Sequence, residues 1–128
     1  MPLNKSTIIH IMERFKFPID QYSLLMGAAL VLHGVKKFAN DIDLGCSPEL
    51  FESFRKTGYE VSVSRAGYQK IVIDEYISIY KGWMPTKTVL IDGVPVSDLE
   101  SIVSDKKRFN RPKDVNDIAL IRAFVANK

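Results

Sequence analysis

The segment from Leu24 to Cys46, LLMGAALVLHGVKKFANDIDLGC, constrains the fold of this chain more than any other part of the sequence. A short apolar run stops at Gly27, and a second apolar segment then continues to Gly34. After two lysines, Asp41 and Asp43 alternate with aliphatic residues. Alternation with a period of two is typical of a strand that has one buried face. The segment therefore predicts a buried strand, a short helix that Gly27 opens, and a second strand that carries both aspartates.

Caps, turn residues and apolar spacing predict the elements of the rest of the chain. The Ser47-Pro48 pair places an N-cap before a proline at the first helical position. Ser97 and Glu100 have the spacing of a capping box, and Asp92-Gly93 suits the turn of a hairpin. Further helices are predicted through Ile8–Phe15, at 48–58, at 98–108 and from Pro112, and further strands at 59–64, 68–80, 88–91 and 94–96. This order predicts an α/β (α+β) fold with a mixed β-sheet flanked by helices.

Length and composition fit one globular domain. The chain has 128 residues, of which 46% are hydrophobic and 26% charged, as in ordinary globular proteins. We expect residues 1–128 to form a single domain, because this length supports one core. The net charge of +3 suits a polyanionic ligand, but the sequence lacks the dense basic stripe of a general nucleic-acid binder.

The single cysteine and the absence of long apolar runs indicate the cellular compartment in which we expect the protein. Cys46 has no cysteine partner, which excludes an internal disulfide and fits a reducing compartment. No apolar run approaches the roughly 18 residues that span a bilayer, and the N-terminus has no signal-peptide core. We therefore expect a cytoplasmic protein that has no membrane partner.

Asp41 and Asp43 form the candidate chemical centre of the sequence. Residues two apart on a strand project to the same side, so the two carboxylates repel each other unless a cation lies between them. Hard oxygen ligands at this spacing suit one or two Mg²⁺ ions, and two metals can stabilise an in-line phosphoryl displacement. The plainer alternative is a strand end at which Asp41 caps a turn and Asp43 pairs with a lysine.

Gly27 adds a candidate phosphate site beside this pair. The first turn of a helix has free backbone N–H groups and a positive dipole end, which together bind phosphates. Glycine lets a ligand approach the backbone closely. The interval from Ala28 to Asp41 is long enough for a short helix and a return to the neighbouring strand. The sequence thus predicts that a phosphate site and a metal site lie side by side.

Two segments of the chain resemble the nucleotidyltransferase superfamily, which has the DNA polymerase β-like fold. MGAALVLHGVKKFANDIDL is similar to the glycine motif, helix and Asp-x-Asp strand of that superfamily. GVPVSDLESIVSDKKRFNRPKDVNDIALI resembles the downstream part of its minimal, toxin-like and antibiotic-modifying members. The two halves cover about four-fifths of the chain in the expected order. This resemblance implies transfer of a nucleoside monophosphate from an NTP, with ATP as the expected nucleotide.

The resemblance also implies roles for individual residues. It makes Asp41 and Asp43 catalytic Mg²⁺ ligands, with two metals possible, and gives nucleotide contacts to the four residues Gly27, Ala28, Lys37 and Lys106. It places Asp114 and Asp117 beside the site on the last helix.

The sequence departs from the family pattern at the third carboxylate, which activates the acceptor hydroxyl in active members. Ser78 occupies the matching strand position, and serine is a poor base and metal ligand. Asp74 faces the same side as Ser78 if the strand 68–80 is unbroken, and we then expect Asp74 to be the third catalytic carboxylate. If Asp74 and Glu75 instead form the tip of a hairpin, neither reaches the metal.

Other polar and aromatic residues have plainer explanations. His33 at a helix end is expected to make a structural hydrogen bond, and His10 to lie on the surface. Trp83, Tyr76 and Tyr80 could stack on a base, but they are expected to cover the edge of the core. Cys46 is expected to be a small buried packing residue. The basic cluster Lys106–Lys113 suits either a solvated helix end or contact with a triphosphate or RNA.

The sequence leaves two main functions open. One is a Mg-dependent nucleotidyltransferase whose acceptor is a protein, a tRNA end or a small hydroxylated molecule such as an antibiotic. The alternative is a catalytically degenerate protein of the same fold that binds a nucleotide or a protein partner. In either case a homodimer or a helical partner protein, as in toxin–antitoxin pairs, could complete the site. A plain RNA-binding module is a third possibility, which would bind without Mg²⁺ and lose affinity steeply with salt.

Overall fold

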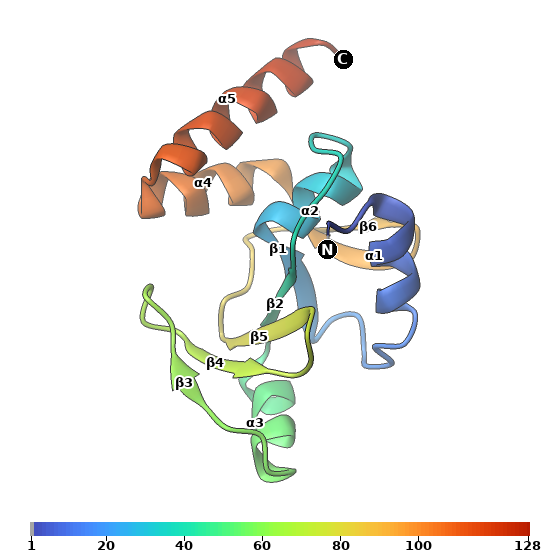
Figure 1. Cartoon of the computed structure of the whole chain (residues 1–128), viewed down its shortest axis with the longest axis vertical. Helices are drawn as coiled ribbons and strands as arrows, with labels where there is room; N and C mark the ends of the chain where they lie inside the picture. The colour runs from blue at the N-terminus through green and yellow to red at the C-terminus, as the bar shows by residue number, and fades with distance from the viewer. Residues whose placement is uncertain (1) are drawn as a thin grey trace.

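The computed structural model describes residues 2–128, which form five helices and seven strands around one sheet (Figure 1). The helices are α1 (Lys5–Met12), α2 (Met26–His33), α3 (Pro48–Lys56), α4 (Leu99–Phe109) and α5 (Pro112–Ala126). The strands are β1 (Tyr22–Leu25), β2 (Ile42–Cys46), β3 (Ser62–Val63), β4 (Gln69–Val72), β5 (Ile77–Lys81), β6 (Thr88–Ile91) and β7 (Val94–Ser97). None of these helices is long and apolar enough to cross a bilayer.

The sheet is mixed and has the order β3-β4-β5-β2-β1-β7-β6. β1 and β2 lie near its centre. They are antiparallel, so the chain reverses its direction between them, through α2 and the loop that follows it. β2 runs parallel to β5, and β1 runs parallel to β7. The predicted α/β fold with a mixed sheet is therefore confirmed.

One face of the sheet is apolar and the other carries polar groups. Ile42 and Leu44 of β2 and Ile79 of β5 are fully buried in the main core, as the alternation in the sequence predicts. Asp43 and Ser78 lie opposite each other in the β2–β5 register, so their side chains share the other face. This second face also carries part of a smaller apolar cluster, which includes Leu25 and Tyr80.

Helices α4 and α5, orange and red in Figure 1, lie together at one end of the molecule. The turn between β3 and β4 points toward the junction of these two helices (Figure 1). Helix α3 lies near the opposite end of the molecule. The Arg108 side chain of α4 bridges toward this turn, because its guanidinium donates a hydrogen bond of 2.9 Å to the Tyr68 hydroxyl.

Three local predictions are wrong. The single strand predicted at 68–80 is a hairpin, because β4 ends at Val72 and pairs back antiparallel onto β5. The strand predicted at 59–64 is reduced to β3. Helix α4 is capped by Asp98 rather than Ser97, since the Asp98 side chain accepts a hydrogen bond from the Ser101 backbone N–H.

Candidate functional site

Asp43 and Asp41 lie at the start of β2, on the polar face of the sheet. Asp43 is in the strand and half-buried, whereas Asp41 just precedes it and is exposed. The Tyr80 hydroxyl donates a hydrogen bond of 3.2 Å to Asp43 Oδ1. Tyr80 lies two residues after Ser78 on β5, so the alternation of that strand brings it to the same face. The structure thus holds one oxygen of Asp43 in place and leaves the other for a ligand.

The environment of Asp43 disfavours its negative charge. Burial, and after it the neighbouring charge of Asp41, raises the pKa of Asp43 to about 6. The Tyr80 hydrogen bond and the charges of Lys70 and Lys113 act in the opposite direction without cancelling the shift. A cation beside the two carboxylates would relieve this penalty.

The N-terminus of α2 is open toward the same face. Its N-cap, Leu25, has no side chain that can accept a hydrogen bond from the helix, so the first backbone N–H groups have no side-chain cap. Met26 has a φ of 53°, a conformation that costs free energy in a residue with a side chain. A Cβ at Gly27 would lie 3.8 Å from Ala39 Cβ, which is an ordinary van der Waals contact, so Gly27 packs beside the loop that leads to β2.

A cleft of about 920 Å³ joins the carboxylates to the start of α2. Its walls come from α2, the loop before β2, the β3–β4 turn, and the α4–α5 junction. Seven basic side chains line it against three acidic ones. The basic residues are Lys36, Arg65, Lys70, Lys106, Arg108, Arg111 and Lys113, and the acidic ones are Asp41, Asp43 and Asp117. The cleft is therefore suited to an anionic ligand.

Lys106 is buried and belongs to an ion-pair network at the back of the cleft. Its Nζ lies 2.9 Å from Asp117 Oδ2 and 3.3 Å from Asp114 Oδ1. Lys36 lies 3.3 Å from Asp117 Oδ1, and Arg111 makes an ion pair with Asp114. Burial alone would raise the pKa of Asp114, but its hydrogen bonds to Arg111 and the charge of Lys106 lower it to about 2. The network ties α5 to α4 and to the loop before β2.

Arg65, Lys70 and Lys113 differ from these lysines because no ion pair engages them within residues 2–128. Lys70 lies over the Tyr80 ring, 5.6 Å from its centroid. Lys70 and Lys113 act on the charge of Asp43, which places both near the carboxylate pair. These three cations are available to a ligand in the cleft.

The other predicted nucleotide contacts are less well placed. Ala28 is 2% exposed and does not line the cleft, so any contact it makes would use its backbone N–H. Lys37 is exposed but lies outside the cleft lining, whereas its neighbour Lys36 lies inside it.

The structure does not support the catalytic role expected for Asp74, because the unbroken strand on which that role depended is absent. Asp74 lies in the turn between β4 and β5, outside the cleft lining. Its Oδ1 accepts hydrogen bonds of 2.8 Å from the backbone N–H groups of Tyr76 and Ile77. Asp74 therefore stabilises the turn, and Ser78 remains opposite Asp43.

The plainer expectations for His33, Trp83 and Cys46 are confirmed. His33 Nε2 hydrogen-bonds the Ser97 carbonyl at 2.8 Å. Trp83 is buried, stacks on Tyr68 with ring centroids 4.9 Å apart, and donates a hydrogen bond to Asp105. Cys46 is fully buried, and burial raises the pKa of its thiol to about 12, so the thiol is unreactive.

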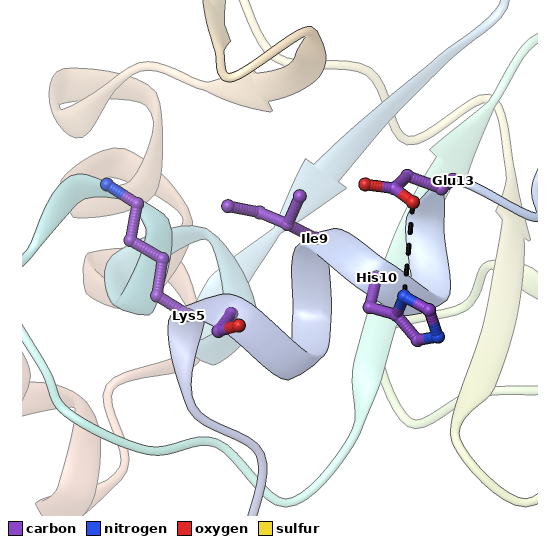
Figure 2. A pocket seen from close by; sticks show the side chains of 5 residues that line it. Lys5, Ile9, His10 and Glu13 are labelled. Atoms are coloured by element: carbon purple, nitrogen blue, oxygen red, sulfur yellow. Dashed lines mark ion pairs between the residues drawn. The ribbon is translucent and has the colours of Figure 1, made fainter.

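A second hollow, of about 480 Å³, lies along α1 and is lined by four residues of that helix and by Glu13, its C-cap (Figure 2). The close-up shows His10 turned toward Glu13, and His10 Nδ1 lies 3.9 Å from a Glu13 carboxylate oxygen. Both side chains are more than two-thirds exposed, as expected for His10. Because no other element contributes a group, this hollow brings no chemistry together.

Lys36, Phe38, Arg65 and Lys70 line the cleft but do not stand out in the sequence, and Tyr80, a candidate for base stacking, instead hydrogen-bonds Asp43. The alternation of β5 would have placed Tyr80 on the same side as Ser78 if the strand had been aligned with β2. The prediction of one long strand at 68–80 concealed the β4–β5 hairpin, which brings Lys70 opposite Tyr80.

The donor set fits Mg²⁺ only as part of a complex with a ligand. Within residues 2–128 no group of three or more histidine, cysteine, aspartate or glutamate side chains could hold a metal ion. Mg²⁺ keeps several waters and is commonly bound by one or two carboxylates together with substrate phosphates. Asp41 and Asp43, with the open start of α2 beside them, match that arrangement.

The fold and the position of these groups define a class of architecture: a mixed sheet with an Asp-x-Asp strand beside a helix that opens at a glycine. A search of solved structures finds a similar fold in a crystal structure described as a putative nucleotidyltransferase from Thermotoga maritima. The match has a TM-score of 0.61 at 13% sequence identity and covers 98% of this chain and 97% of that one. The chain therefore has a nucleotidyltransferase-like fold. No protein-family model and no curated protein matches the sequence.

Proposed function

We propose that the protein is a Mg-dependent nucleotidyltransferase that moves a nucleoside monophosphate from an NTP, with ATP as the expected donor, to an acceptor. The observation that carries this proposal is the meeting of three features in one cleft. These are the carboxylates of Asp41 and Asp43, the uncapped N-terminus of α2 at Gly27, and an excess of basic side chains. A nucleoside triphosphate with Mg²⁺ has the charges that complement all three.

In this proposal each wall of the cleft has a separate task. The backbone N–H groups at Gly27 and Ala28 bind phosphate oxygens, and Arg65, Lys70 and Lys113 offset the remaining negative charge. Asp41 and Asp43 would hold Mg²⁺, which supplies charge stabilisation at the phosphate that is attacked. Catalysis by such a site consists mainly of positioning and electrostatic stabilisation.

In the proposed function, Lys106 does not bind the nucleotide directly. Because its ammonium group already bonds to Asp114 and Asp117, it holds the start of α5, with Lys113, against the cleft. The same ion pairs leave Lys106 less able to bind a triphosphate. We therefore assign Lys106 a positioning role.

One observation favours the alternative function, a protein of this fold that binds a nucleotide or a partner protein without turnover. Ser78 lies opposite Asp43, and Asp74 is committed to its turn, so neither supplies a third carboxylate. An active enzyme would need another group to accept the proton of the acceptor hydroxyl. A homodimer or a helical partner, as in a toxin–antitoxin pair, could bring that group to the open side of the cleft.

The proposal places the protein in the cytoplasm, where NTPs and Mg²⁺ are available and where the thiol of Cys46 remains reduced. The acceptor is one of the three classes that the resemblance allows: a protein side chain, a tRNA end or a small hydroxylated molecule. The basic lining of the cleft disfavours a polycationic antibiotic among these.

Calorimetric titration with NTPs, with and without Mg²⁺, tests the binding half of the proposal. We expect saturable binding that requires Mg²⁺ and is lost in the variant Asp41→Asn/Asp43→Asn. Binding that is unchanged in this variant would refute the site. Transfer of label from an α-phosphate-labelled NTP to protein, tRNA or an antibiotic then separates the enzyme from the degenerate alternative, which binds but transfers nothing.

A further inference from the structure

We infer that Phe38 is the base platform of the cleft: its ring stacks on the nucleobase of the bound nucleoside triphosphate. This inference rests on the proposed function and adds a specific residue to it. Phe38 lies in the loop between α2 and β2, lines the cleft, and is 55% exposed.

The exposure of Phe38 sets it apart from the other aromatic residues of the cleft. Trp83 and Tyr80 are 7% and 8% exposed, and their rings pack on each other. Phe109 packs edge-on against Trp83, and Arg108 lies over it. Within residues 2–128, no ring pair and no cation–π contact involves Phe38. Phe38 therefore has ring surface available to a flat ligand.

The backbone on either side of Phe38 is held in place, so the ring has a defined position. Ala39 exchanges two hydrogen bonds with Leu3, of 2.6 and 3.0 Å, in an isolated β-bridge. Lys36 is tied to Asp117 of α5 by its ion pair. An exposed aromatic side chain on a fixed backbone is typical of a preorganised contact, because little conformational entropy is lost on binding.

Phe38 also lies close to the residues that are proposed to bind the phosphates and the metal. Ala39, the next residue, is the nearest neighbour of a Cβ built at Gly27, at 3.8 Å. Asp41 follows three positions after Phe38. Phosphates at Gly27 and Asp41 would therefore leave the ribose and base directed along the same wall. Stacking on an aromatic face suits any of the four bases, because each has a π-face.

Titrations with two anions test this inference, because inorganic tripolyphosphate has the phosphates of an NTP and no base. We expect Phe38→Ala to weaken Mg²⁺-dependent ATP binding at least about fivefold and to leave Mg²⁺-dependent tripolyphosphate binding within about twofold of wild type. Phe38→Trp keeps a flat ring and should retain ATP affinity. Leu90→Ala removes an equally exposed apolar side chain from β6 and should change neither titration.

The outcomes separate this inference from the proposed function. If Phe38→Ala weakens ATP and tripolyphosphate equally, or weakens neither, the ring does not bind the base and the inference is wrong. In either case the phosphate and metal site still stands. If wild-type protein binds neither anion, the proposed function fails and the base platform with it.

Discussion

Replacing Asp43 with asparagine should stabilise the protein in the absence of metal. Asparagine has nearly the same shape as aspartate and can still accept the Tyr80 hydrogen bond, but it carries no charge. The folded environment raises the pKa of Asp43 from 3.8 to about 6, so the folded state disfavours the ionised carboxylate. At ~1.4 kcal/mol per pH unit, this difference makes the wild type about 3 kcal/mol less stable at neutral pH than it would be with an unperturbed carboxylate.

The dependence on pH follows from the direction of the pKa shift. Below the unfolded pKa of 3.8 the carboxyl is protonated in both states, and the variant should have no advantage. As the pH rises from about 4 to about 6, the unfolded chain ionises first, so the wild type loses stability and the advantage of Asp43→Asn grows. Above about pH 7 the advantage is constant at about 3 kcal/mol.

Urea unfolding in a chelator-containing buffer, followed by the fluorescence of the single buried Trp83, measures this difference. The matched control is Asp41→Asn. It removes the charge of Asp41 but leaves Asp43 buried, and burial is the larger cause of the raised Asp43 pKa, so this variant should stabilise the protein less. An Asp43→Asn variant that is less stable than wild type at neutral pH, or a difference that does not change with pH, would refute the reasoning. Either result would mean that the carboxylate is already compensated by protein groups.

Three further substitutions test the structural account by the same unfolding assay. Gly45→Ala should destabilise the fold by about 3 kcal/mol or more, since its Cβ would lie 1.6 Å from the carbonyl oxygen of Trp83, and a smaller loss would contradict that close contact. Lys106→Met should cost about 3–5 kcal/mol, because it leaves two buried aspartates without their shared cation, and a neutral effect would show that the network is dispensable. Asp74→Ala should cost about 1–2 kcal/mol through two lost hydrogen bonds and leave NTP binding unchanged in calorimetry. Loss of NTP binding in Asp74→Ala would instead show that Asp74 takes part in the nucleotide-binding site.

The central part of the fold could be predicted from the sequence because its signals are local. The alternation around Asp41 and Asp43 identifies β2, and Gly34 in the left-handed conformation ends α2 where the sequence ends its apolar run. Ser47 caps α3 through its hydrogen bond to Leu50, as the Ser-Pro pair predicts. These features depend on neighbours in the chain and not on the tertiary structure.

The predictions failed where pairing between distant residues decides the outcome. The β-forming residues on both sides of Asp74-Glu75 allow either one long strand or a hairpin, and the antiparallel pairing of β4 with β5 shows that the chain reverses near Asp74. The Lys106 network likewise joins α4, α5 and the loop before β2, and no local pattern reveals that its ammonium group is buried. In both cases, contacts between residues far apart in the sequence determine which charged side chains line the cleft.

The most direct test of the central claim is to locate the metal by NMR with Mn²⁺ in place of Mg²⁺. Paramagnetic Mn²⁺ broadens the signals of nearby amides. In the presence of ATP, the account predicts that broadening centres on Ile42–Leu44 and extends to Gly27, and that Mn²⁺ without nucleotide broadens these signals far less. Broadening centred elsewhere, such as the α1 hollow at His10 and Glu13, or no broadening at β2, would contradict the proposal that Asp41 and Asp43 hold a metal–nucleotide complex.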